Sequence, residues 1–454
     1  MQIPENIKFL SAFNIAQILH NKKLSPIDLV NYYYSEIEKF SSPNPYTILT
    51  KERALAEAKD SHKRLKEDKA LSPLDGVPVA WKDLFDFKNI TTIGGSKVLE
   101  KKNRIASKDA YVVSLAKKAG LIQIGKTSTV ELALGGLGTN TNFTTPENTI
   151  MKDVPRVPGG SSSGSGVALS NNLCAASFGT DTGGSVRIPA AWNKLIGLKT
   201  SIGRISLNGV LELASTYDTV GPLTNSVKDA SLLFSILTEQ TYFDLEKLNP
   251  KNINLISVKG MPWEKCDTKI INTIEAVINK LSIKGIKITE KKIPEIEEMH
   301  KLLLEHNGGT TIAEAYNKWK GIVEKHSDLF DKNVLNRMLK GKTINQNSLK
   351  IIYDAEELYS KKLNISTSDY DALIMPTIPI LPPEINKVTN DERIYNKYNT
   401  LALRNTRIAN SLRMCAITLP CPSNKPIGIM LCMNKGNDEK LLTLADTIYN
   451  IIKE

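Results

Sequence analysis

Histidine and cysteine are scarce in this sequence, with five of each among 454 residues. The cysteines are odd in number and widely spaced, and no two of them form a C-x-x-C pair. This distribution is typical of free thiols in a reducing compartment, and it disfavours disulfides and a zinc site. The histidines are His20, His62, His300, His306 and His326. None lies near the glycine-rich segment described below, so a Ser-His-Asp triad would need contacts between residues far apart in the sequence.

Long apolar runs, a leader pattern and a basic tract are also missing. No window of about 18 uninterrupted apolar residues occurs, which argues against a membrane-spanning helix. The first residues, MQIPENIKFLSAF, lack the basic segment and apolar run of a secretion signal. Lys and Arg exceed Asp and Glu by 59 to 48, a formal charge of +11, but the two signs alternate along the chain. We therefore expect a cytoplasmic protein that contacts neither a membrane nor nucleic acid directly.

The rest of the composition is that of a globular protein, with 41% hydrophobic and 24% charged residues. Short apolar runs bounded by Gly and Pro predict buried strands at 76–82, 121–126, 195–199, 371–376, 415–419 and 427–432. Helical spacing between these runs favours an α/β layer structure. Residues 240–370 are rich in Lys and Glu and read as helical. We predict one domain over residues 1–454, with a helical, substrate-side insertion at 240–370.

The most unusual stretch spans residues 159–189. It opens with GGSSSGSG and closes on Gly183, Gly184 and Ser185. Glycines are used where a chain turns tightly or where another backbone approaches closely. A serine held after such glycines can be exposed as a nucleophile, with free backbone N–H groups around it. The stretch therefore predicts the catalytic centre of a serine-dependent amide hydrolase.

Other interpretations of this stretch fit less well. A phosphate-binding loop of the G-x-x-x-x-G-K type needs a lysine that is absent here. The pattern G-x-S-x-G can be placed on residues 160–164, but a second glycine-serine turn follows in place of a strand-to-helix elbow. A flexible Ser/Gly linker is disfavoured by the well-patterned apolar runs on both sides.

A lysine ends one of the predicted strands. The run GVPVAWK places Lys82 at the inner end of a buried strand. One interpretation is an ordinary surface lysine at the exit of a strand. The other is a desolvated lysine, since burial lowers the pKa of an ammonium group and can make it a base. The sequence pattern alone leaves both open.

Several segments together resemble the amidase signature family. GGSSSGSG at 159–166 and GTDTGGSVRIP at 179–189 match its serine-rich loop and GGS turn, with 185 − 161 = 24 residues between the two key serines. GVPVAWKDLFD, TTIGGS, IGKTSTVELALGG, YDTVGPLTNSVKDA and DALIMPTIP also look like family segments. The resemblance is strong over 70–235, patchy over 370–450 and weak in the insertion. It implies a central twisted mixed β-sheet covered by helices on both faces.

The resemblance also implies roles for matching residues. Ser185 is expected to be the nucleophile, and Lys82 the neutral base. Ser161, which family members hold after a cis peptide bond, is expected to relay the proton between them. The oxyanion hole is expected to consist of four backbone N–H groups, those of Thr182, Gly183, Gly184 and Ser185.

Neighbouring residues are expected to support this centre. Asp181 and Arg187 would brace the second turn as an ion pair, and Ser162 would hydrogen-bond within the network. Ser163 stands where many family members have glycine. The resemblance implies neither a metal nor another cofactor.

The predicted reaction is hydrolysis of a linear carboxamide to a carboxylate and ammonia or an amine, through a serine acyl-enzyme. Segments of the chain look closest to small-molecule amidases of the biuret and carboxybiuret hydrolase type. The alternative is the glutaminase (A) subunit of a glutamyl-tRNA(Gln) amidotransferase, which works inside a complex. A third class, a scaffold that has lost catalysis, is disfavoured because Lys82, Ser161 and Ser185 are all present.

Substrate recognition is less defined by the sequence. Arginine binds carboxylates with two parallel hydrogen bonds, so we expect Arg404 and Arg407, together with Tyr316, to contact a carboxylate of the substrate. Solvated helix-face side chains are the alternative for each. The expected partners are a small-molecule amide and either a second copy of the chain or, for an amidotransferase component, small partner subunits.

Overall fold

The computed structural model describes residues 3–4, 6–306 and 309–454. Its strands are β1 (Tyr46–Leu49), β2 (Pro78–Lys82), β3 (Ile122–Thr127), β4 (Ala176–Thr180), β5 (Ile196–Lys199), β6 (Val220–Thr224), β7 (Asn254–Lys259), β8 (Lys287–Lys292), β9 (Ala372–Pro376), β10 (Cys415–Pro420) and β11 (Gly428–Met433). Its α-helices are α1 (Ala12–His20), α2 (Pro26–Lys39), α3 (Lys51–Lys66), α4 (Lys97–Lys102), α5 (Tyr111–Lys118), α6 (Ser163–Ser170), α7 (Arg187–Trp192), α8 (Val227–Thr238), α9 (Thr268–Ile283), α10 (Pro294–Glu305), α11 (Thr310–Val323), α12 (Lys332–Gly341), α13 (Gln346–Ser366), α14 (Ile385–Thr389), α15 (Glu392–Ser411) and α16 (Asp438–Lys453).

All of these strands belong to one mixed sheet. The strand order is β1-β3-β2-β4-β6-β5-β10-β11-β9-β7-β8. β2 is parallel to both of its neighbours, β3 and β4, and β7 is parallel to β8 and β9, whereas the other pairs are antiparallel. The last two strands, β10 and β11, lie between β5 and β9. The sheet is therefore completed only by strands from distant parts of the chain.

Both faces of the sheet are buried under helices. Along β9, Ile374 belongs to one hydrophobic cluster, while Leu373 and Met375 belong to another. Successive side chains of a strand point to opposite faces, so the two clusters lie on opposite sides of the sheet. One cluster contains residues of α2, α8 and α16, and the other contains residues of α10, α13 and α15. The predicted α/β fold with a mixed sheet covered on both faces is confirmed.

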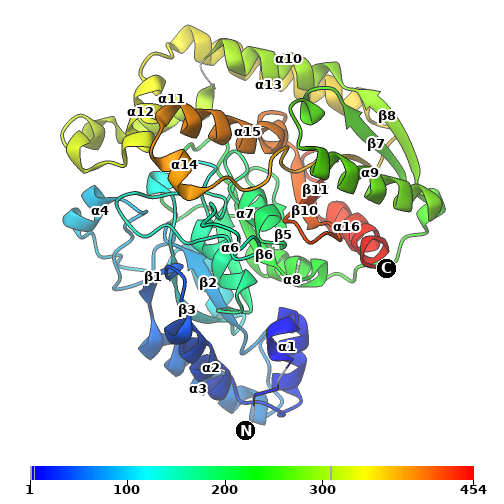
Figure 1. Cartoon of the computed structure of the whole chain (residues 1–454). Coiled ribbons are helices and arrows are strands. Elements are labelled where there is room, and N and C mark those ends of the chain that lie inside the picture. The colour runs from blue at the N-terminus through cyan, green and yellow to red at the C-terminus, as the bar shows by residue number, and fades with distance from the viewer. Residues whose placement is uncertain (1–2, 5, 307–308) are drawn as a thin grey trace.

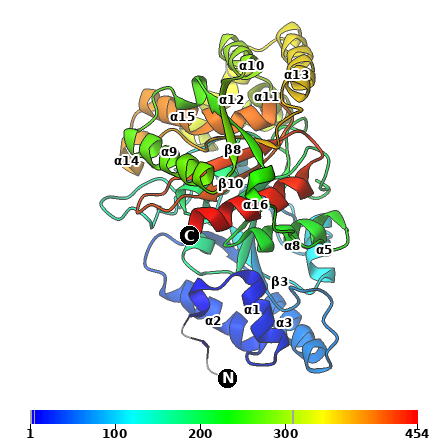
Figure 2. The same ribbon diagram turned by 90° about the vertical axis from the view of Figure 1, so that its right-hand side faces the viewer.

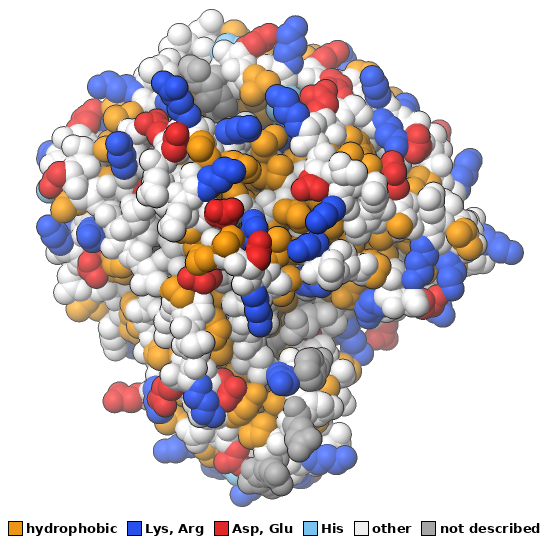
Figure 3. Space-filling model, in the orientation of Figure 1, with side chains coloured by type: hydrophobic (Ala, Val, Ile, Leu, Met, Phe, Trp, Pro, Cys, Tyr) orange, Lys and Arg blue, Asp and Glu red, His pale blue; other side chains and the backbone are white. Residues whose placement is uncertain are grey.

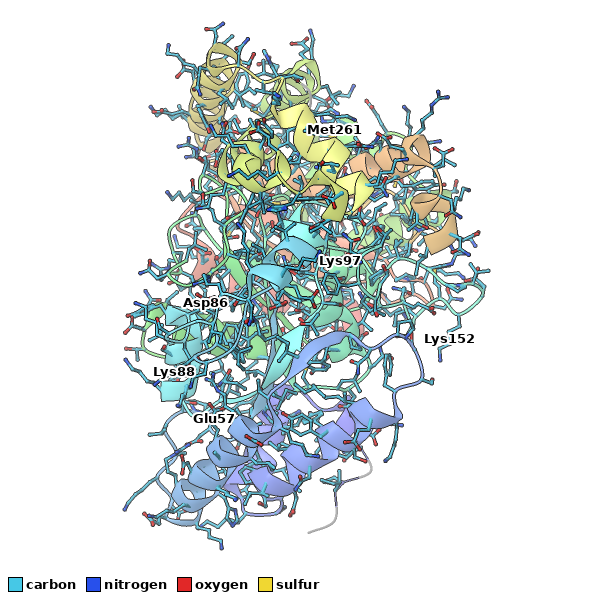
Figure 4. All side chains as sticks on the ribbon, turned by 90° about the vertical axis from the view of Figure 1, so that its left-hand side faces the viewer. Glu57, Asp86, Lys88, Lys97, Lys152 and Met261 are labelled. Carbon is cyan, nitrogen blue, oxygen red and sulfur yellow. The ribbon has the colours of Figure 1, made fainter. Side chains whose placement is uncertain are left out.

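The N-terminal helices and the α10–α13 helices lie at opposite ends of the molecule (Figures 1 and 2). Ser25 begins α2 as predicted, since its hydroxyl accepts a hydrogen bond from the amide of Ile27 and Pro26 occupies the first turn. Glu57 of α3, labelled in Figure 4, accepts a hydrogen bond of 2.8 Å from the amide of Gln123 on β3. This bond ties α3 to the sheet.

The segment predicted as a helical insertion differs from that prediction. Residues 240–370 contain helices α9–α13, but they also contribute β7 and β8 to the sheet. β8 has no apolar run, because it is an exposed edge strand of sequence KITEKK. Charged residues of this kind protect an edge from pairing with other chains. β7 is buried, but its alternating sequence NLISVK was read as part of the helical region.

The segment YDTVGPLT, predicted as a loop, also contains a strand. Gly221 and Pro222 suggested a turn, but residues 220–224 form β6 between β4 and β5. A Cβ on Gly221 would overlap the carbonyl oxygen of Leu198 on β5. The glycine is therefore required by the close approach of two strands, and not by a turn.

The outer surface agrees with the charge pattern of the sequence. Basic and acidic side chains are interspersed over the face seen in Figure 3. Among the described residues, no helix combines the length and the hydrophobicity needed to cross a bilayer.

Candidate active site

The carboxyl ends of two parallel strands bring the first candidate residues together. Lys82 ends β2, and Thr180 ends the adjacent strand β4. One residue earlier on β2, the Trp81 ring stacks on the Phe178 ring of β4 at 4.1 Å between centroids. This stacking holds the two strand ends in register. The carboxyl edge of parallel strands is where α/β sheets commonly build their sites.

The ammonium group of Lys82 is fully enclosed. Its Nζ lies 2.7 Å from the hydroxyl of Ser161 and 2.8 Å from that of Thr180. Burial lowers the pKa of Lys82 to about 7, although the carboxylates of Asp218 and Asp181 act in the opposite direction. Of the two sequence interpretations, the desolvated lysine is the one found. A large fraction of this side chain is neutral near pH 7.

Ser161 lies in the loop that leads into α6. The peptide bond between Gly160 and Ser161 is cis, as the resemblance implied. The amide of Ser162 donates a 3.2 Å hydrogen bond to the carbonyl of Ser185, and this bond joins the serine-rich loop to the second glycine-serine turn. Ser163 begins α6, and its hydroxyl donates to the carbonyl of Ser128. The two halves of the 159–189 stretch are thus packed against each other.

A buried ion pair organises the second turn. Arg187 donates to both carboxylate oxygens of Asp181, at 2.8 and 3.0 Å, and both side chains are fully buried. Burial alone would raise the pKa of Asp181, but the Arg187 guanidinium holds it well below its ordinary value. Arg187 also donates to the carbonyl of Thr406 and to the side chain of Asn410, both on α15. The predicted brace therefore extends from the turn to α15.

The backbone amides of the second turn differ in their availability. The amide of Gly184 donates a 2.8 Å hydrogen bond to Asp181. In the part of the chain that the structure describes, the amides of Thr182, Gly183 and Ser185 have no hydrogen-bond partner. An unpartnered amide in a buried turn can bind an oxyanion. Three of the four predicted donors are available, and Gly184 is not, because Asp181 already accepts from it.

A second buried carboxylate supports the same turn. The hydroxyl of Thr182 donates to Asp218 at 2.5 Å, and the amides of Leu213 and Ala214 donate to the other oxygen of this carboxylate. Burial raises the pKa of Asp218 to about 6. The carboxylate therefore positions Thr182 by accepting hydrogen bonds from three groups.

A narrow cavity opens at this turn. Ser185, Thr182 and Gly183 line it together with residues 133–135, Arg337 and Arg407. Residues 131–133 form a single 3-10 turn in place of the predicted helix, because Leu132 and Ala133 have positive φ angles of 48° and 62°. The cavity gives a ligand access to the Ser185 side chain and to the unpartnered amides.

The sequence profile of the family described as Amidase matches residues 28–442 of the chain. This match covers most of the sequence, including every strand from β2 to β11 and every element of the site described above. The chain belongs to the amidase family. The predicted membership is therefore confirmed, and with it the prediction of a hydrolase that acts on carbon–nitrogen bonds other than peptide bonds.

Individual members of the amidase family resemble the chain over its whole length. The 2-amino-5-chloromuconic acid deaminase of Comamonas testosteroni is 29% identical, with 98% of this chain and 97% of the deaminase aligned. The glutaminase (A) component of the glutamyl-tRNA(Gln) amidotransferase of Saccharolobus solfataricus is 32% identical, with coverages of 96% and 95%. An amidase crystal structure superposes with a TM-score of 0.87 at 26% identity, covering 98% of this chain and 100% of that amidase.

The three side chains predicted to contact a substrate carboxylate lie in different places. Arg407 lines the cavity beside Ser185. The guanidinium of Arg404 donates to the carbonyls of Pro262 and Glu264, so its donors are spent on the backbone. The hydroxyl of Tyr316 donates to Glu324 on the outer side of α11. Neither Arg404 nor Tyr316 lines this cavity, and we do not retain these two as substrate contacts.

Sequence reasoning missed several residues of the site. Thr180 lies in the stretch that was singled out, and its place one strand-end away from Lys82 could have been noticed once β4 was recognised. Asp218 and residues 133–135 fall in segments that were matched to the family without a role. Arg337 carries no local signal, because it is one basic residue among several on α12.

Proposed function

We propose that this amidase hydrolyses a carboxamide through an acyl-enzyme on Ser185, with Lys82 as the base. The observation that supports this best is the 2.7 Å contact between the Lys82 Nζ and the Ser161 hydroxyl in a fully buried setting. A neutral lysine can accept a proton without any histidine, and burial supplies the lowered pKa that keeps it neutral.

The proton moves in both directions along this chain of groups. The Ser185 oxygen attacks the amide carbon while its proton passes to Ser161, and the Ser161 proton passes to Lys82. The C–N bond then breaks, and the departing amine takes a proton back from Lys82 through Ser161. Water repeats the first step at the acyl carbon, which releases the carboxylate and restores the Ser185 hydroxyl.

The oxyanion formed in each attack is proposed to accept from the amides of Thr182, Gly183 and Ser185. Their lack of other partners among the described residues supports this role. Losing one such donor typically costs about 2.7–4 kcal/mol of transition-state stabilisation. Asp181 and Arg187 hold the turn, and Asp218 holds Thr182, so the donors are fixed before substrate binds.

The glutaminase component of a glutamyl-tRNA(Gln) amidotransferase is the second candidate. The 32% identity with the Saccharolobus solfataricus protein, over nearly the full length of both chains, favours it. The 29% identity with a deaminase of 2-amino-5-chloromuconic acid favours a small-molecule enzyme to a similar degree. The proposed chemistry at Ser185 is the same for both.

A screen of ammonia release from simple amides tests the catalytic assignment. We expect Ser185→Ala to lose activity by at least about 10³-fold, since removal of a covalent nucleophile leaves only binding and oxyanion stabilisation. Ser163→Ala is the matched control, because Ser163 is a neighbouring buried serine that lies outside the proposed relay. A Ser185→Ala protein with wild-type activity would refute the proposal.

A further inference from the structure

Two guanidinium groups lie in the cavity beside Ser185. Arg337 comes from α12 and Arg407 from α15, and both line the cavity that Ser185 and Gly183 also line. Within the described ranges, neither side chain donates a hydrogen bond or forms an ion pair. α12 is held in place by Asp331, which caps its first turn by accepting from the amides of residues 333 and 334.

This pair differs from the other enclosed arginines of the chain. Arg53, Arg64 and Arg187 each have a carboxylate partner, and Arg404 has two carbonyl partners. Burial and the neighbouring Arg337 lower the pKa of Arg407 to about 10. Two partly enclosed guanidinium groups with no counter-charge are unfavourable unless an anion joins them. The arrangement therefore has the chemistry of a site for an anion.

The remaining cavity wall narrows the class of anion. Its apolar part is formed by Ala133, Leu134, Leu213 and Leu403, and its polar side chains are hydroxyls such as that of Thr311. No acidic side chain lines the cavity in the described part of the chain. A carboxylate can be bound there, whereas an ammonium group would lie beside two cations with no partner of its own.

We propose that the substrate is a small amide that carries a carboxylate, which Arg337 and Arg407 bind while the carboxamide carbon lies at Ser185. The site disfavours substrates with an α-ammonium group, such as glutamine and asparagine. This inference rests on the proposed function, since it takes Ser185 as the reacting group. It assigns substrate selection to α12 and α15, outside the 159–189 stretch.

Three amides of equal chain length test the selection. Succinamate carries a carboxylate, butyramide has a methyl group in its place, and asparagine is succinamate with an added α-ammonium group. We expect kcat/KM for succinamate to exceed that for the other two by at least about tenfold, as charge-assisted hydrogen bonds to a carboxylate provide. Equal kcat/KM for succinamate and butyramide would overturn the proposal, as would a preference for asparagine.

Charge-removing variants test the two arginines. Arg337→Gln and Arg407→Gln are each expected to lower kcat/KM for succinamate by roughly 10- to 100-fold and to leave butyramide within about threefold. Lys340→Gln on α12 and Arg393→Gln on α15, both exposed, are the matched controls and are expected to change neither value. If the arginine variants lowered both substrates equally, the arginines would be structural and the proposal would be wrong.

A binding measurement separates this inference from the proposed chemistry. Calorimetry of succinamate with Ser185→Ala protein needs no turnover, and adding Arg407→Gln is expected to weaken binding at least about tenfold. Arg407→Lys is expected to recover part of the loss, because it restores charge without the bidentate geometry. Wild-type activity in Ser185→Ala would refute the catalytic assignment alone. Absence of succinamate binding to Ser185→Ala would refute the carboxylate site alone.

Discussion

Among single residues, Lys82 illustrates how burial changes what a side chain can do. A solvated lysine is protonated at neutral pH and cannot act as a base. At the end of β2, two hydroxyls are the only hydrogen-bond partners of its Nζ in the described part of the chain. The nearest carboxylates, Asp181 and Asp218, are engaged with other donors. The cost of charging the amine is therefore not offset by an ion pair.

The pH dependence of activity follows from the lowered pKa of Lys82. Because the neutral amine is the base, kcat/KM should rise with pH below about 7 and become level above it. A lysine with an ordinary pKa would instead give a rate that keeps rising toward pH 10. The measurement is ammonia release from one good amide between pH 5 and pH 10, with circular dichroism at each pH as the control for folding. A tenfold rise per pH unit that continues above pH 9 would contradict the assignment.

Adjacent glycines of the second turn should respond differently to a methyl group. Gly184 has a φ of +132°, and a Cβ there would lie 2.6 Å from the Cβ of Thr406. Gly183 would place a Cβ 3.6 Å from Leu403, an ordinary contact. We expect Gly184→Ala to lose roughly 1–3 kcal/mol of unfolding free energy, and Gly183→Ala to lose much less. Thermal and urea unfolding of the two variants make the comparison, and equal losses would show that the turn relaxes freely.

At the scale of elements, α13 is connected to the loop that carries Asp218. Glu356 of α13 is fully buried and accepts a hydrogen bond from the hydroxyl of Tyr217. Burial is the main cause that raises the pKa of Glu356 to about 8, from an ordinary value of 4.5. The folded protein therefore keeps this proton over a pH range in which the unfolded chain has lost it.

Stability should consequently depend on pH through Glu356. The raised pKa means that its contribution is fully present below about pH 4.5 and is lost as pH rises through about 8. Glu356→Gln removes this group, so its unfolding free energy should fall less between pH 5 and pH 8 than that of the wild type. Urea unfolding at several pH values measures the slope. Glu357→Gln, one residue along and exposed, is the control and should leave the slope unchanged.

Elements that follow one simple pattern could be predicted from the sequence. Apolar runs between Gly and Pro identified β2, β3 and β9, and the resemblance placed Lys82, Ser161 and Ser185. β6 was missed because Gly221 and Pro222 are also turn residues, and their presence in a strand depends on the distance to β5. β8 was missed because an exposed edge strand needs no apolar face.

The same limit applies to the candidate site. The engagement of the Gly184 amide by Asp181 and the meeting of Arg337 with Arg407 depend on three-dimensional contacts. No spacing in the sequence reports such contacts. Arg404 and Arg407 are three residues apart on one helix and look equivalent in the sequence. One donates to the carbonyls of residues 262 and 264, and the other lines the cavity.

For the whole molecule, the two candidate functions make different demands on partners. If the chain is a small-molecule amidase, the purified protein should release ammonia from succinamate with no other protein present. If it is the glutaminase component of a complex, it should be nearly inactive alone and should require added partner subunits. The assay is ammonia release by the protein purified by size-exclusion chromatography, with Ser185→Ala as the blank. Full activity alone would exclude an obligatory complex.

The strand order has a further consequence for how the protein is made on the ribosome. β5 ends at residue 199, but its neighbour β10 begins only at residue 415, a separation of 415 − 199 = 216 residues. At about 5–20 residues per second, this neighbour appears roughly 10–40 s later. During that interval β5 presents an unpaired edge, and Arg187 lacks its α15 contacts. The nascent chain is therefore most vulnerable to aggregation midway through synthesis, and catalysis can begin only after the C-terminal strands are added.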